Sequence, residues 1–174
     1  SVTDLPVTRD SYKNVTISNT TSCSADISVS GNWVNNGTFT SSGSSTVTFS
    51  GSSSQTLSGS GINNFENITL NNSNGLSLNS GTVNISEVMS STNGTFTQNG
   101  ANIILKSTAS NSAGLIKVSS SSEYSYSSGT FTTERYYNAT NTGWRMVGAP
   151  IQNATLNDWD DEFDYCGFTG ADYS

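Results

Sequence analysis

The densest group of residues able to do chemistry is a set of carboxylates near the C-terminal end: Asp158, Asp160, Asp161, Glu162 and Asp164. Hard cations such as Ca²⁺ take six to eight oxygen ligands from side chains of this kind. The alternation at 158, 160 and 162 is similar to an EF-hand loop, but Trp159 and Phe163 interrupt it and no glycine occupies the sixth position. The cluster is therefore a candidate Ca²⁺ site. The alternative is a solvated acidic turn with both aromatic rings packed inward.

Four tyrosines form a second candidate site, a surface for a ligand or a protein partner: Tyr124, Tyr126, Tyr136 and Tyr137. Aromatic rings of this kind can stack on sugars. Tyr124 and Tyr126 alternate, so both face the same side if the segment is a strand. Trp33 and Trp144 are expected in the core or in a cap.

The sequence contains little that could catalyse a reaction. It has no histidine, which removes the commonest general base, and its many serines have no visible activator. Glycoside hydrolysis needs two carboxylates about 5 to 9.5 Å apart. Between Ser11 and Ser122 the acids are Asp26, Glu66 and Glu87, at spacings that do not stack two carboxylates on adjacent coils. We predict no catalytic residue and no cofactor apart from the candidate Ca²⁺; a polysaccharide lyase or hydrolase is the enzymatic alternative.

Charge and hydropathy restrict the partners. The net charge is −7 with six Lys and Arg residues, so the chain lacks the basic patch that nucleic acids require. No stretch approaches 18 apolar residues, and we expect no direct membrane insertion. Cys23 and Cys166 are far apart in sequence, and their pairing is left open.

The elements that must position these residues are short strands. Ser, Thr, Asn and Gly make up about half of the chain, and apolar residues recur at period two between clusters of turn residues. No segment of useful length has a helical period. The predicted strands are 26–29, 37–40, 46–49, 55–57, 67–70, 76–78, 82–85, 95–97, 103–105 and 115–118.

These strands fit either a parallel β-helix or a β-sandwich, and weak internal repeats favour the β-helix. Residues 12–17 resemble 65–70 at an offset of 53, and residues 36–40 resemble 93–97 at an offset of 57. Coils of about 25 to 30 residues would make each offset two coils. The tight corners are expected to use Asn and Gly, which accept a left-handed backbone. The expected corner asparagines, which stand beside Gly or Ser, are Asn35, Asn36, Asn72, Asn74 and Asn99.

The predicted fold is therefore all-β, a parallel β-solenoid. Residues 1–132 are expected to form its repetitive body, and 133–174 a more aromatic C-terminal cap or the start of a second domain. One narrow core should contain eight apolar side chains: Phe39, Phe49, Ile68, Leu78, Ile85, Phe96, Leu105 and Ile116.

Several phrases resemble the repeat regions of large secreted proteins of Bacteroidetes, many of them exported to the cell surface by the type IX secretion system. In the repeats these are residues 31–39, 47–51 with 55–57, and 65–72; after them come 134–136, 144–150 and 167–173. The resemblance implies an extracellular or cell-surface location and a place within a longer polypeptide.

The function predicted from these observations is a non-enzymatic secreted surface module, a structural spacer or adhesin-type segment. Its expected partners are other surface or secretion-system proteins, or further copies of itself, with polysaccharide as a further candidate. Two alternatives stay open. One is a carbohydrate-binding or carbohydrate-active domain, and the other is cargo bound to a secretion or surface-assembly machine.

Overall fold

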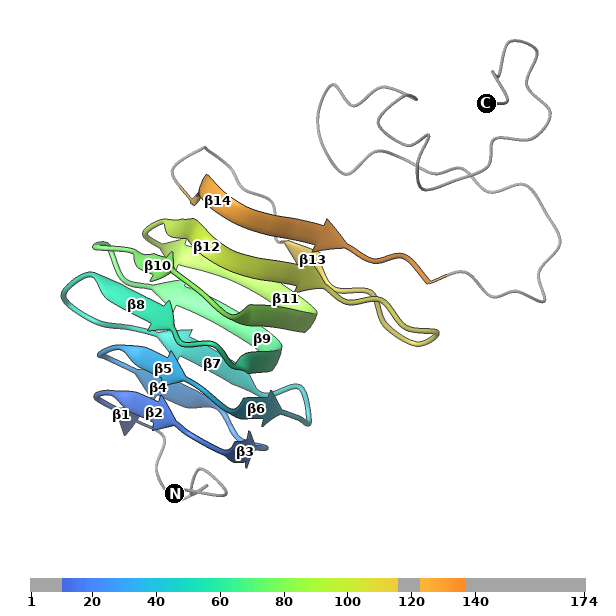
Figure 1. Ribbon diagram of the computed structural model, residues 1–174, viewed down its shortest axis with the longest axis horizontal. Helices are drawn as coiled ribbons and strands as arrows, with labels where there is room; N and C mark the ends of the chain where they lie inside the picture. The colour runs from blue at the N-terminus through green and yellow to red at the C-terminus, as the bar shows by residue number, and fades with distance from the viewer. Residues whose placement is uncertain (1–10, 116–122, 137–174) are drawn as a thin grey trace, which may run out of the picture. The chain divides into compact units, whose positions relative to one another are not determined.

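The computed structural model describes residues 11–115 and 123–136. All regular secondary structure in these ranges is β-strand, and the strands stack in parallel as a β-solenoid of about 5 turns (Figure 1). The predicted solenoid is thus confirmed over the β-sandwich. Short period-two segments form this fold because each strand buries alternate side chains and pairs with the equivalent strand one turn away.

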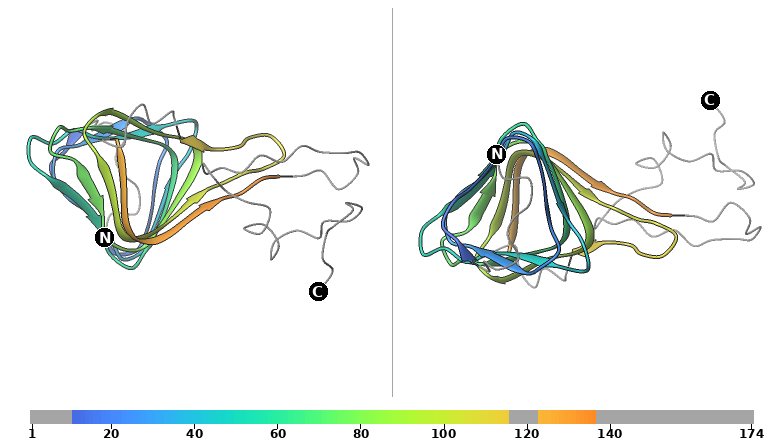
Figure 2. Two further views of the ribbon diagram at one scale, coloured as in Figure 1. Left: turned by 90° about the horizontal axis from the view of Figure 1, so that it is seen from above. Right: turned by 90° about the horizontal axis from the view of Figure 1, so that it is seen from below.

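Each full turn passes through three strand segments, which build three faces around the core (Figure 2). Face A consists of β1 (Ser11–Tyr12), β4 (Ile27–Val29), β7 (Thr46–Phe49), the C-terminal halves of β9 (Ile62–Asn71) and β11 (Thr82–Asn93), and β13 (Gly114–Leu115). Face B consists of β2 (Val15–Ile17), β5 (Trp33–Asn35), β8 (Gln55–Ser58), β10 (Leu76–Leu78) and the N-terminal halves of β12 (Phe96–Leu105) and β14 (Tyr124–Thr133). Face C consists of β3 (Thr20–Cys23), β6 (Thr38–Ser41), the N-terminal halves of β9 and β11, and the C-terminal halves of β12 and β14.

The earlier coils are shorter than the sequence pattern suggested. Residues stacked one coil apart differ by 18 in number for Asn14 and Asn32, and by 21 for Gly59 and Ser80. The last step, from β12 to β14, reaches a difference of 28 for Asn102 and Thr130. The predicted coil length is therefore wrong for the earlier coils, because short strands joined by short corners close a turn sooner.

The repeats that led to this prediction are not stacked on one another. Val15 lies on face B whereas its counterpart Ile68 lies on face A, and Phe39 lies on face C whereas Phe96 lies on face B. A short strand after a corner has the same needs on every face, so similar phrases recur without marking equivalent positions. The repeats indicated a repetitive fold correctly but gave the wrong period.

The core is one continuous apolar column, and seven of the eight predicted core residues are buried in it; Ile116 lies outside the described residues. It contains an aromatic cluster around Trp33, which is also fully buried. The Trp33 ring centroid is 4.8 Å from that of Phe39 and 5.7 Å from that of Phe65. Burial of these rings supplies much of the hydrophobic stabilisation that this mostly polar chain can gain.

Buried amide side chains tie adjacent coils together inside this core. Asn63 points inward, and its Oδ1 accepts hydrogen bonds from Trp33 Nε1 at 2.9 Å and from Asn35 Nδ2 at 2.9 Å. Gln55 does the same at another corner: its Nε2 donates to Val29 O at 2.9 Å, and its Oε1 accepts from Asn72 Nδ2 at 3.0 Å. Each amide satisfies backbone or side-chain groups that would be costly to bury unpaired.

The corners use asparagine differently from the prediction. Among the described residues other than glycine, only Ser44 has a positive φ, so the predicted corner asparagines do not adopt a left-handed backbone. They stabilise corners through side chains instead: Asn72 Oδ1, for example, accepts from Asn74 N at 2.9 Å. Seven glycines take positive φ values, which confirms the other half of the corner prediction. At Gly59, with φ 106, an added Cβ would lie 2.1 Å from Asn35 O.

The chain divides into two units, Ser1–Asn138 and Ala139–Ser174, and all the described residues belong to the first. The predicted boundary at 132/133 falls at the last residue of β14, and the predicted cap lies almost entirely outside the described residues. Cys23 is buried in β3 and its Sγ donates to Ala25 O at 3.2 Å. Cys166 lies outside the described residues. No described helix is long and apolar enough to cross a lipid bilayer.

Candidate interaction surface

Tyr124 and Tyr126 occupy alternate positions of β14, as predicted, and pair in register with Phe96 and Gln98, which are buried. The side they share is therefore the inner side of the coil. Tyr124 packs against the core, its ring centroid is 5.6 Å from that of Phe131, and its hydroxyl donates to Gln98 Oε1. Burial raises the pKa of the Tyr124 phenol far above its ordinary value, and the neighbouring Tyr126 phenol adds to that rise.

Tyr126 and Phe131 remain accessible although they stand at core positions. Tyr126 is 60% exposed and its hydroxyl donates to Gly129 O at 3.0 Å, while Phe131 is 36% exposed. Within the described residues β14 pairs only with β12, so no strand covers these rings as β14 covers Phe96. The last coil thus presents an aromatic end.

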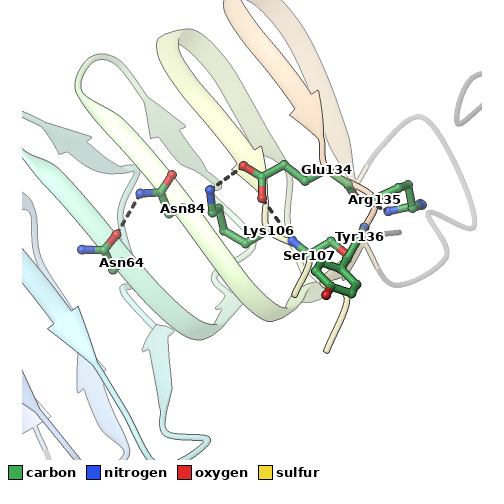
Figure 3. A network of polar contacts seen from close by, with 7 residues as sticks. All are labelled: Asn64, Asn84, Lys106, Ser107, Glu134, Arg135 and Tyr136. Atoms are coloured by element: carbon green, nitrogen blue, oxygen red, sulfur yellow. Dashed lines mark hydrogen bonds and ion pairs between the residues drawn. The ribbon is translucent and has the colours of Figure 1, made fainter. Parts of the chain in front are cut away.

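Tyr136 follows the C-terminal end of β14, beside Glu134 and Ser107 (Figure 3). Its backbone N donates to Ser107 Oγ at 2.9 Å, and its side chain is 50% exposed. Beside it Lys106 Nζ forms an ion pair with Glu134, whose Oε2 also accepts from Ser107 N at 3.2 Å. The hydrogen bond from Lys106 holds the pKa of the Glu134 carboxyl below its usual value, outweighing partial desolvation.

Face C presents a regular surface, on which two columns of outward side chains cross six successive strand segments. One column contains Thr20, Thr38, Ile62, Thr82, Asn102 and Thr130. The other contains Ser22, Thr40, Asn64, Asn84, Ile104 and Thr132. None of the twelve is charged, and seven are exposed. On face A the comparable columns, through residues such as Thr48 and Thr69, are half-buried.

The charged side chains of the described ranges stand at corners rather than on faces. The corner between faces C and A, the C–A corner, carries Asp26, Glu66, Glu87, Lys106, Glu134 and Arg135. Glu87 accepts there from Ser44 Oγ at 2.8 Å and from Asn67 Nδ2 at 2.8 Å. Carboxylates of this corner thus link one coil to another. No group of three or more metal-ligating side chains occurs in the described ranges.

The remaining predicted site residues lie outside the described residues: Tyr137 and the acidic cluster Asp158, Asp160, Asp161, Glu162 and Asp164. Sequence reasoning missed the columns of face C and the Lys106–Glu134 pair. The columns had a signal, since Thr-x-Thr and Thr-x-Asn phrases such as Thr38 with Thr40 and Thr82 with Asn84 mark outward positions. The ion pair had none, because its partners are far apart in the sequence.

The fold and these surfaces define the class: the chain is a parallel β-solenoid repeat protein, and the outer faces formed by residues 11–115 and 123–136 are uncharged. No protein-family model, curated protein or solved structure matches it.

Proposed function

We propose that this chain is a non-enzymatic structural and adhesive segment of a larger protein at the cell surface, in which stacked coils form a stiff spacer. The observation that carries the proposal is the way successive coils are linked on both sides of the strands. Inside, buried amides such as Asn63 join one coil to the next. Outside, two side-chain hydrogen bonds join adjacent coils. Thr69 Oγ1 and Ser90 Oγ lie 3.1 Å apart, and Asn84 Nδ2 donates to Asn64 Oδ1 at 2.8 Å.

Such linkage supports a mechanical role. In a solenoid each coil contacts only its neighbours, so stiffness depends on the strength of every interface between coils. Here each interface combines a parallel strand ladder, a buried apolar contact and side-chain hydrogen bonds. Serine, threonine and asparagine on the outside keep the faces hydrated without adding charge repulsion.

The cell-surface location rests on the resemblance to repeat regions of type IX secretion substrates of Bacteroidetes. An extracellular spacer also suits a net charge of −7 and a chain rich in uncharged polar residues. Its partners would be other surface or secretion-system proteins, or neighbouring copies of the same segment.

Two separate experiments test the cell-surface location and the mechanical role. Protease treatment of intact native cells should remove the chain from the outer surface, and resistance to protease until cell lysis contradicts the location. Pulling the purified chain by its ends should give resistance to unfolding above that of a flexible Ser/Gly linker. Extension at the low forces of a random coil contradicts the spacer role.

Catalytic assays test the non-enzymatic part. The described carboxylates of the solenoid body include Glu66 and Glu87, so Glu66→Gln and Glu87→Gln are the informative variants. A polysaccharide-cleaving activity that either substitution abolishes would overturn the proposal.

A further inference from the structure

Face C is a regular grid of hydroxyl, amide and aliphatic groups. Neighbouring coils in a β-solenoid are about 4.7–4.9 Å apart, and alternate residues of one strand are about 6.6–6.8 Å apart. Hydroxyl and amide groups can donate and accept hydrogen bonds, and Ile62, at 44% exposure, adds an aliphatic contact. A partner that matches this grid must itself present hydrogen-bonding groups of both kinds at short, regular intervals.

Several groups of the grid are held in place by their neighbours. Asn64 Nδ2 donates to Phe39 O at 3.2 Å and to Thr40 Oγ1 at 3.3 Å. At the other end Thr130 Oγ1 donates to Asn102 Oδ1 at 2.9 Å. Side chains that are already ordered lose less conformational entropy when a partner binds.

The charges around the grid restrict the partner further. Face C itself is uncharged, and the strands of this face end at the C–A corner, where Glu66, Glu87 and Glu134 outnumber Lys106 and Arg135. An anionic polymer would be repelled by this edge and by the net charge of −7. Face C also lacks the aromatic and arginine anchors that dominate protein–protein interfaces. A neutral polymer rich in hydroxyls fits these constraints.

We propose that face C is a docking surface for neutral polysaccharide chains that contact several coils at once. The inference rests on the proposed adhesive function and names its ligand class. Each hydroxyl contributes little on its own, so affinity comes from repeated contacts along one polymer. Polymers therefore bind measurably whereas short oligosaccharides do not, and binding is insensitive to salt because no charge takes part.

The test is native electrophoresis of the full chain through gels containing hydroxyethylcellulose, a neutral β-linked glucan, or polygalacturonate, an anionic polymer. The neutral polymer should retard the chain equally at low and high salt, and the anionic polymer should not. The face C variant carries Thr38→Val, Thr40→Val and Thr82→Val, which remove hydroxyls while keeping the branched shape. Its matched control on face A carries Thr46→Val, Thr48→Val and Thr69→Val.

The face C variant should bind the neutral polymer at least about tenfold more weakly, from the loss of up to three hydrogen bonds, whereas the face A control should bind like the original chain. The corresponding triple serine variant of face C should retain binding. Circular dichroism checks folding; if the valine variant unfolds, Ile62→Lys places a charge at an exposed position of face C and should also weaken binding.

Three results would overturn the inference: no retardation by the neutral polymer, equal weakening by the face A and face C substitutions, or stronger binding of polygalacturonate. A chain that resists pulling and lies on the cell surface but binds no neutral polymer refutes only the docking surface. A chain absent from the cell surface refutes the proposed function.

Discussion

The buried amide of Asn63 offers the sharpest test of how this solenoid is held together. Replacing it with valine, Asn63→Val, keeps a branched side chain in an inward position but removes the acceptor for two donors. Trp33 Nε1 would lose the acceptor at 2.9 Å, and Asn35 Nδ2 would keep its hydrogen bond to Ile62 O at 3.0 Å. The variant therefore leaves one buried donor fully unpaired and weakens a second.

An unpaired buried donor costs about 1–3 kcal/mol, so we expect Asn63→Val to lower the free energy of unfolding by about 2–4 kcal/mol. The assay is urea denaturation followed by far-ultraviolet circular dichroism. The matched control is Asn64→Val, the next residue on the same strand, which points outward. Its hydrogen bonds are only partly buried, so water can replace them, and we expect a loss below about 1 kcal/mol.

A double-mutant cycle separates the hydrogen bond from simple loss of packing. Trp33→Phe removes the indole donor, so adding Asn63→Val to that background should cost about 1–2 kcal/mol less than in the original chain. Additive effects of the two substitutions, or an Asn63→Val variant as stable as the Asn64→Val control, would refute the argument that the amide is retained for the indole.

Three further substitutions test the corners, the C–A ion pair and the last coil. Gly59→Ala should cost about 3 kcal/mol in thermal or urea unfolding, because φ is 106 and the new Cβ would lie 2.1 Å from a backbone oxygen. The control Gly114→Ala, with open space around the residue, should change stability by less than about 0.5 kcal/mol. Equal effects of the two substitutions would contradict this account. Because the pKa of the Glu134 carboxyl is lowered in the folded chain, its contribution to stability is present above pH about 4.5 and is lost as pH falls through the folded pKa. Glu134→Gln should remove less than about 1 kcal/mol at neutral pH and flatten that part of the pH–stability curve. An unchanged curve would count against the ion pair with Lys106. Because the pKa of the Tyr124 phenol is raised in the folded chain, stability should fall as pH rises above about 10. Absorbance titration of the native original chain and of Tyr124→Phe should show the same number of phenols that ionise at their ordinary pH. One more such phenol in the original chain would disprove the burial of Tyr124.

The fold was predictable because alternation identifies inward positions without knowledge of which strands pair. Phe49, Leu78 and Ile85 could be assigned to the core from period two alone, and all three are buried. Period two does not report the length of a coil, which depends on how many residues each corner uses. At the Gly59 corner, for example, the backbone of the neighbouring coil passes 2.1 Å from where a Cβ would lie. This close approach appears only once the coils are stacked, so the sequence alone does not predict it.

The candidate surfaces were predictable only in part. Alternation placed Tyr124 and Tyr126 on one side of a strand, but whether that side is inner or outer depends on register with Phe96 and Gln98 in the coil below. The columns of face C likewise exist only once the coils are stacked. Thr40 and Asn64 are distant in the sequence and become neighbours through the pairing of β6 with β9.

The adjacent pair Asn63 and Asn64 shows why composition alone could not separate structure from surface in this chain. Asn63 is 1% exposed and binds the indole of Trp33, whereas Asn64 faces outward and links Thr40 to Asn84 across the coils. Both are asparagine, and alternation alone assigns one to the core and the other to face C. A mostly polar sequence can therefore specify a single register, because a slip by one residue would bury Asn64 without the indole and expose the apolar column. The same polar residue types serve inside as connectors between coils and outside as the uncharged grid on which the proposed glycan docking depends.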